Sequence, residues 1–214
     1  MGWMRNWLVD FGAGFGACGR LLTLLAEKKS MQLHTDQLIE KNNSFPAGDF
    51  EGCRFVHCDL GGTDFSQINF TECVFEDCNL SGCKILQTTF NDVRFVRCKM
   101  LGLHFETASQ YLFTVGFAHS TLDLCSFYQC KMKKTLFSHC SLQEVDFTES
   151  LLTEAVFEDC NLRDAKFENT VLEKADLRTA INFSINPEMN KIRKARFSYP
   201  AVLTLLDKYG IMID

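Results

Sequence analysis

Cysteine is the residue through which this sequence could most readily do chemistry, because thiolates bind zinc and pairs of thiols form disulfides. The chain has 11 cysteines among 214 residues. No two of them stand in the C-x-x-C spacing of zinc sites, and pairs such as Cys53/Cys58 and Cys125/Cys130 are five residues apart. We therefore predict small core residues rather than metal ligands or disulfide partners. So many free thiols indicate a reducing, cytoplasmic location.

Histidine offers a second route to chemistry, since His119 and His139 are 20 residues apart. A fold that repeats with this period would stack the two rings on one outer face, where a metal ion could bind both. No carboxylate or cysteine on that face is expected to complete such a site. The sequence also lacks a Ser-His-Asp arrangement, a phosphate-binding loop and a buried carboxylate pair. We therefore expect no catalytic residue, no metal and no cofactor, and a protein that is not an enzyme.

A five-residue sequence repeat determines the secondary structure that must position these residues. A large apolar residue, the centre of each repeat, recurs every five residues from Phe45 to Phe105 and again from Leu112 to Leu177. The two runs are out of step by two residues, which places an insertion within Glu106–Tyr111, a segment that includes Gln110. Six phenylalanines define the predicted core: Phe50, Phe70, Phe90, Phe127, Phe147 and Phe167.

A small residue stands two places before most centres, and ten of the cysteines occupy this position. Residues two apart in an extended segment lie on the same side, so both point inward while the remaining three point outward. The chain must then turn once in every repeat. Four turns of about a right angle close a coil of 20 residues, in agreement with the 20-residue spacing of Leu60, Leu80 and Met100. We therefore predict an all-β solenoid, a quadrilateral β-helix of about seven coils with a short C-terminal helical cap.

Four segments follow from this pattern. Residues 1–30 are an N-terminal extension, either non-native or upstream of a start at Met31, or an amphipathic helix, and their apolar run is too short to span a membrane. Residues 31–44 form a lead-in, residues 45–181 the β-helix, and residues 182–214 a helical cap.

The cap is predicted to contain two helices. Asn186, Pro187 and an acidic first turn begin a helix that extends to about Ala195. The second runs from Pro200 to Gly210, and a short apolar strand follows it. The apolar surface exceeds what a cap needs, so we expect a homodimer joined through this end. Its interface residues are Leu203, Leu206, Ile211 and Ile213.

Acidity is concentrated in the repeats. The chain carries a net charge of −5, whereas residues 31–181 carry 22 acidic and 13 basic side chains. This balance argues against direct nucleic-acid binding. Eight acidic residues are candidates for contact with a partner: Glu144, Glu149, Glu154, Glu158, Asp159, Asp164, Glu168 and Glu173. Two interpretations stay open, a DNA-like surface for a basic groove and a solvated surface that keeps the molecule soluble.

The small-x-Phe/Leu-x-x repeat over residues 45–180 resembles the pentapeptide-repeat proteins. The segments Ser184–Ile192 and Leu205–Ile211 are similar to the ending of one group of that family, which contains the microcin B17 immunity protein and the Qnr quinolone-resistance proteins. The resemblance implies a right-handed β-helix and a dimer that acts on DNA gyrase or topoisomerase IV as an acidic mimic of DNA. Because only a two-residue insertion is present, the long loops of Qnr proteins are missing. The alternative is a generic scaffold rod with an unrelated partner.

Overall fold

The computed structural model describes residues 32–41 and 45–212 of the chain. The chain divides into two units, Met1–Met31 and Gln32–Asp214, and the second contains everything described below. The predictions made for residues 1–30 and for Ile213 lie outside the described residues.

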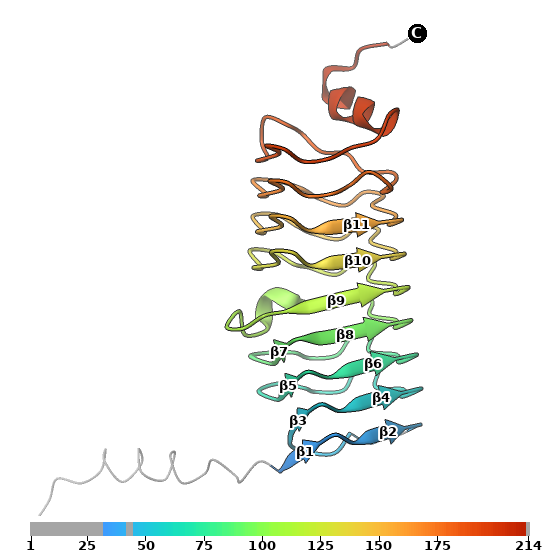
Figure 1. Cartoon of the computed structure of the whole chain (residues 1–214), viewed down its shortest axis with the longest axis vertical. Coiled ribbons are helices and arrows are strands. Elements are labelled where there is room, and N and C mark those ends of the chain that lie inside the picture. Colours follow the sequence, from blue (N-terminus) through green and yellow to red (C-terminus); the bar gives the residue numbers. More distant parts are fainter. Residues whose placement is uncertain (1–31, 42–44, 213–214) are drawn as a thin grey trace, which may run out of the picture. The chain divides into compact units, whose positions relative to one another are not determined.

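Very short strands alternate with turns along the second unit (Figure 1). The strands are β1 (Leu33–Thr35), β2 (Leu38–Glu40), β3 (Asp49–Glu51), β4 (Arg54–Val56), β5 (Asn69–Thr71), β6 (Val74–Glu76), β7 (Thr89–Asn91), β8 (Val93–Val96), β9 (Val115–Ala118), β10 (Leu136–Ser138) and β11 (Val156–Glu158). Two 3-10 helices accompany them, η1 (Phe105–Thr107) and η2 (Ala201–Tyr209).

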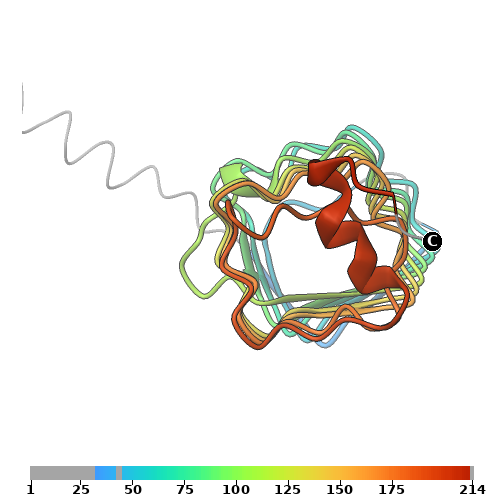
Figure 2. The same cartoon turned by 90° about the horizontal axis from the view of Figure 1, so that it is seen from above.

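All strand pairs are parallel and join residues of successive coils. One sheet has the order β1-β3-β5-β7, and the other has seven strands in the order β11-β10-β9-β8-β6-β4-β2. The register aligns Phe50 with Phe70 and Phe55 with Phe75, a spacing of one 20-residue coil. Seen from above, the coils superpose on a four-sided outline (Figure 2). The predicted all-β solenoid, a quadrilateral β-helix, is confirmed.

The four walls of the coil are named here by their buried centres between residues 142 and 157: the Leu142, Phe147, Leu152 and Phe157 walls. The seven-stranded sheet forms the Phe157 wall, since β11 contains that residue. The four-stranded sheet lies on the Leu152 wall, towards the N-terminus. Each outward residue therefore has neighbours 20 residues before and after it in the chain.

The turns between walls place the residue two positions after most centres in the left-handed region. In the turn from Leu60 to Thr63, the Thr63 N–H donates to the Leu60 carbonyl at 3.0 Å and Gly62 has φ 72°. A positive φ at the third residue is the requirement of a type II turn. Most such positions are not glycine; Leu124 has φ 63° and Glu144 has φ 56°.

Stacked phenylalanines fill the interior. Ring centroids are 5.4 Å apart between Phe50 and Phe70 and 5.2 Å apart between Phe147 and Phe167, with nearly parallel planes. All six predicted core phenylalanines are buried. The ten cysteines of the described residues are buried, which confirms their prediction as core residues. Several thiols donate to a carbonyl of the preceding coil, as Cys78 Sγ does to Phe55 at 3.4 Å.

The insertion is confirmed, because the ladder spacing changes from 20 to 22 residues where Lys99 pairs with Thr121 and His104 with Ser126. The prediction that Leu112 is an inward-facing centre is wrong. Its side chain is 53 % exposed and its φ is 56°, while Phe113 is buried instead. The inserted residues bring Leu112 into a left-handed turn, so the next side chain faces the core.

The predicted helix from Pro187 to Ala195 is also wrong. Those residues form turns, and the ladder continues through the bridges Val171–Lys191 and Asp176–Arg196. The ladder therefore extends beyond residue 181, where the sequence pattern placed its end. The second helix is present as η2, with Gly210 left-handed at its C-terminus, and residues 211 and 212 form no strand.

Candidate functional site: charged surfaces of the coil

The eight acidic candidates do not share one face. Residues 20 apart lie in one column, whereas each step of five moves to the next wall. The candidates divide in pairs: Glu144 and Asp164 at the edge of the Leu142 wall, Glu149 and Glu168 on the Phe147 wall, Glu154 and Glu173 on the Leu152 wall, and Glu158 and Asp159 on the Phe157 wall. The structure therefore brings together only part of the predicted set.

Glu154 and Glu158, which lie on two of these walls, have partners within the molecule. Glu154 lies 3.3 Å from Lys174 Nζ and 3.7 Å from Lys134 Nζ. The hydrogen bond from Lys174 lowers the pKa of Glu154. On the Phe157 wall, the Ser138 hydroxyl donates to Glu158 at 2.7 Å. These carboxylates are engaged within the molecule and are weaker candidates for contact with a partner.

Four of the other candidates, together with Asp146, form a group that we call the acidic corner, which covers the Phe147 wall and the turns at its two edges. It consists of Glu144, Asp146, Glu149, Asp164 and Glu168. The bridges Ser126–Asp146 and Asp146–Lys166 place Asp146 in the ladder of the Phe147 wall. Of this group, Glu144 and Glu168 have no ion pair or hydrogen bond to their carboxylates among the residues that the structure describes. Like charges in one column repel, so this arrangement destabilises the fold locally.

The other members have weak or neutral partners. Gln129 donates to Glu149 at 2.7 Å, and Arg163 Nε lies 4.0 Å from Asp164. Both are exposed pairs, which contribute at most about 1 kcal/mol. The acidic corner therefore remains the least neutralised group of predicted carboxylates.

The histidine pair stacks as predicted. The rings of His119 and His139 are 4.7 Å apart between centroids and 4° from parallel. Asp159 was predicted only as a contact for a partner, and its place beside the histidines was missed; its carboxylate lies 3.6 Å from His139 Nδ1. The same 20-residue spacing would have found it. Within residues 32–41 and 45–212, no group of three ligating side chains could hold a metal ion.

The segment of the insertion is held by its polar residues. The His104 ring hydrogen-bonds to Glu106 at 2.8 Å. Gln110 donates to the Phe105 and Ala108 carbonyls and accepts from the Lys131 N–H, so its amide connects the insertion to the next coil. Tyr111 is 76 % exposed and projects from the surface. Gln110 is thus structural, and Tyr111 is available to a partner.

Grooves interrupt the described walls, and two of them have volumes of about 400 Å³ or more. One, of about 480 Å³, is lined by Ser66, Lys84, His104 and their neighbours. The other, of about 400 Å³, lies over β8, β9 and β10, where Gly116 leaves space. In the part of the chain that the structure describes, no hydrogen bond joins Ser66 to His104, so the first groove lacks an activated nucleophile.

Three of the residues predicted to form a dimer interface lie at the C-terminal end of the described chain. Leu203 and Leu206 are half-buried on η2, and Ile211 is 54 % exposed. Exposed apolar neighbours, which the prediction did not include, surround them: Tyr199, Val202, Tyr209 and Met212. Among the described helices, none is long and apolar enough to span a membrane.

Comparisons with known proteins show which family has this architecture. A family model described as "Pentapeptide repeat region" matches residues 48–123 and 111–177, which is more than half of the chain. No curated protein matches the sequence. Among solved structures, trypsin-treated QnrB1, a plasmid-mediated fluoroquinolone resistance protein, is similar with a TM-score of 0.52 and 16 % identity, over 86 % of this chain and 92 % of that one.

A second solved structure is HetL, a pentapeptide repeat protein involved in heterocyst differentiation regulation from the cyanobacterium Nostoc. It has a TM-score of 0.46 and 14 % identity, over 84 % of this chain and 93 % of that one. The family match covers the same five-residue repeat that sets the centres, the turns and the four walls. The chain therefore belongs to the pentapeptide-repeat family.

Proposed function

We propose that this protein is a non-enzymatic, cytoplasmic factor that binds a type II topoisomerase, DNA gyrase or topoisomerase IV. In this proposal the acidic corner enters the basic groove that otherwise holds DNA. The biological role is immunity to a toxin or protection from a quinolone-type drug. The observation that carries the proposal is the acidic corner, in which Glu144 and Glu168 lack partners in the described part of the chain.

The chemistry of the corner favours a basic partner. Glu144, Glu149, Asp164 and Glu168 are exposed on a rigid ladder, so binding would cost little ordering of the backbone. Uncompensated carboxylates on such a scaffold steer a basic groove towards it and speed association. Duplex DNA carries about one charge per 1.7 Å. The corner is a sparser array, which makes moderate affinity the expectation.

The test is a DNA supercoiling assay with purified gyrase and the full chain. We expect inhibition of supercoiling, or protection from a quinolone, at micromolar protein. A corner variant, Glu144→Lys with Asp164→Lys, should abolish the effect because it reverses two charges in one column. The matched control is Glu158→Lys with Glu173→Lys, which makes the same change on the other two walls and should retain the effect.

The alternative function is a scaffold rod with an unrelated partner, which the dispersal of acidic residues over four walls favours. It predicts that the wild-type protein neither inhibits gyrase nor protects it at micromolar concentration. That result would contradict the topoisomerase proposal.

A further inference from the structure

Seven exposed cations gather on the C-terminal half of the Leu152 wall. We call them the basic surface: Lys131, Lys133, Lys134, Lys174, Lys191, Arg193 and Lys194. The ladder Lys131–Leu151–Val171–Lys191 shows that these residues belong to one wall. The Lys174 N–H donates to the Arg193 carbonyl at 3.0 Å, which places the last two coils in contact.

Most of these cations are not neutralised by the protein. Glu154 pairs with Lys134 and Lys174, and Glu173 is the other carboxylate on this part of the wall. The remaining five cations have no ion pair within the residues that the structure describes: Lys131, Lys133, Lys191, Arg193 and Lys194. In contrast, the arginines of the Phe157 wall are paired, as Arg97 is with Asp77 and Arg196 with Asp176. The basic surface therefore has a strong local positive potential.

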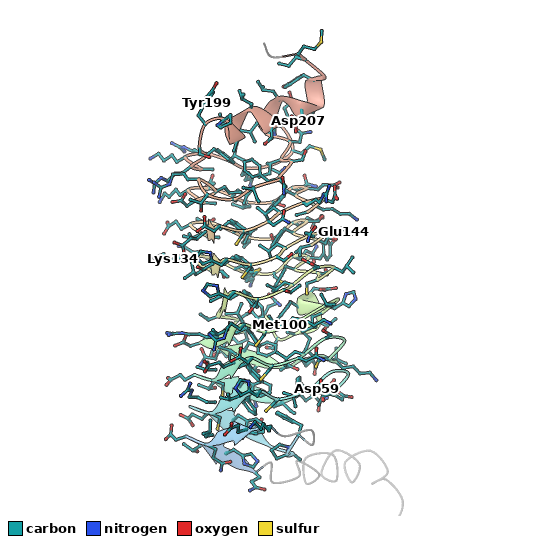
Figure 3. All side chains as sticks on the ribbon, turned by 90° about the vertical axis from the view of Figure 1, so that its right-hand side faces the viewer. Asp59, Met100, Lys134, Glu144, Tyr199 and Asp207 are labelled. Carbon is teal, nitrogen blue, oxygen red and sulfur yellow. The ribbon has the colours of Figure 1, made fainter. Side chains whose placement is uncertain are left out.

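The basic surface and Glu144 lie on opposite sides of the coil, whereas Glu149 stands in the turn that joins the Phe147 wall to the Leu152 wall. Lys134 and Glu144 are two repeats apart, which is half of a coil, and Figure 3 shows them on opposite sides of the molecule. Charges separated by more than the Debye length, about 10 Å at 0.1 M salt, are largely screened from one another. A net charge of −5 therefore does not describe what a ligand meets at this wall.

We propose that the basic surface binds the phosphate backbone of a nucleic-acid duplex without reading its sequence. The cations form two clusters, one in residues 131–134 and one in residues 191–194, that are three coils apart. At the spacing of β-strands this separation is about 14 Å. The major groove of B-DNA is about 12 Å wide, so each cluster can contact one of the two backbones that flank it.

The other outward residues of the Leu152 wall limit which kind of nucleic acid can bind and where on the wall it can lie. Between the clusters the outward residues are Leu151, Thr153, Val171 and Lys174 with the two glutamates, and none is aromatic. This composition disfavours single strands, whose bases stack on aromatic side chains. The N-terminal half of the wall carries Asp49, Glu51, Glu72 and Asp92, which repel phosphate and confine a duplex to the C-terminal half.

The expected binding is non-specific and depends on salt. Such binding has dissociation constants on the order of 10⁻⁴ to 10⁻⁶ M at physiological salt, and each neutralised phosphate contributes about −0.9 to the slope of log K against log salt. Five contacts from the unpaired cations would give a slope of about −4 to −5. Removing two of these cations should reduce the slope by about two.

The test is fluorescence anisotropy of a labelled duplex of about 20 base pairs with the full chain and no topoisomerase, from about 50 to 200 mM salt. Lys133→Gln with Arg193→Gln removes one exposed, unpaired cation from each cluster. The control, Lys84→Gln with Lys99→Gln, removes from the Phe147 and Leu142 walls two exposed cations that form no ion pair within 4.0 Å in the described part of the chain. For the first variant, we expect the slope of log K against log salt to become smaller in magnitude by about two, and the affinity at about 50 mM salt to fall at least about tenfold. The control variant should bind the duplex as the wild type does.

Two results would overturn the proposal. One is no binding by the wild-type chain at low salt; the other is an equal loss in both double variants. A second copy of the chain is the competing occupant, since the acidic half of one wall could meet the basic half of another. If Lys133→Gln with Arg193→Gln lowers the molecular mass in solution and leaves duplex binding unchanged, that occupant is supported instead. Because the assay contains no topoisomerase, its outcome is independent of the supercoiling result.

Discussion

At the scale of the residue, most buried centres have a small side chain two places before them that is also buried. A thiol or hydroxyl two places before a centre fits the space beside a phenylalanine and donates to a carbonyl, as Thr88 Oγ1 does to Phe65 at 2.7 Å. The sequence shows this position clearly because its members are small. The left-handed turn residues include Glu, Lys, His and Leu, so no residue type reveals them. Their conformation follows from the geometry of the coil.

Substitution of Leu124 tests whether the left-handed turns are strained. This residue has φ 63° and is 57 % exposed, and a branched side chain in the left-handed region costs roughly 1–2 kcal/mol. Leu124→Asn should raise the free energy of unfolding by about 1 kcal/mol, since asparagine tolerates this conformation. Urea denaturation measures it. Leu151→Asn, at an exposed position without a positive φ, is the control and should give no gain; equal effects in both variants would refute the explanation.

At the scale of the element, the ladder overrides local helix signals. The Asn186 side chain accepts the Glu188 N–H at 3.0 Å, so the capping signal in the sequence is real. A helix does not follow, because Asn190 and Ile192 take the small and centre positions of another repeat. The five-residue pattern after residue 177 was hidden by Asn182, which stands where a centre is expected. The number of inserted residues was readable from the sequence, whereas the exposure of Leu112 was not.

Asn190 tests whether the coil continues to this point. Its amide donates to the Phe167 carbonyl and accepts the buried Thr170 N–H, each at 2.8 Å. Asn190→Leu leaves that N–H without a partner, which should cost about 1–3 kcal/mol of unfolding free energy. Thermal or urea denaturation measures the change. An unchanged stability would favour the helix that the sequence predicted.

Asp176 makes the last coils sensitive to acid. Hydrogen bonds from Arg178 lower its pKa, and Arg196 lies 3.2 Å away. The pKa is lower in the folded state, so the stabilisation is fully present above the unfolded value and is lost as pH falls through the folded value. We expect Asp176→Asn to be less stable than the wild type near neutral pH and the difference to shrink below about pH 4. Urea midpoints measured across this range would contradict the account if the difference stayed constant.

At the scale of the whole molecule, the fold disperses what the sequence clusters. Ten acidic residues between 144 and 176 look like one surface in the sequence, yet consecutive repeats turn them onto four walls. The same turning collects lysines and arginines from residues 131 to 194 into the basic surface. Columns 20 residues apart could be predicted, as the histidine stack shows. Ion pairs between columns could not, because they depend on side-chain reach.

Self-association through the C-terminal end can be tested by substitution. The exposed apolar side chains of this end, Tyr199, Ile211 and Met212 among them, would be buried by a second copy. We expect a homodimer in sedimentation experiments, and Ile211→Asp should convert it to a monomer because the charge would be buried without a partner. Leu124→Asp, far from this end in sequence and exposed, is the control. A wild-type chain that is monomeric at high micromolar concentration would contradict the prediction.

The proposed contact between the acidic corner and a type II topoisomerase can be measured as the binding isotherm of the full chain with purified gyrase in the absence of DNA. We predict saturable binding at micromolar concentration that falls at least about tenfold in Glu144→Lys with Asp164→Lys, a loss of about 1.4 kcal/mol or more. Binding by Glu158→Lys with Glu173→Lys should match the wild type. No binding by the wild type, or equal binding by both double variants, would contradict the account.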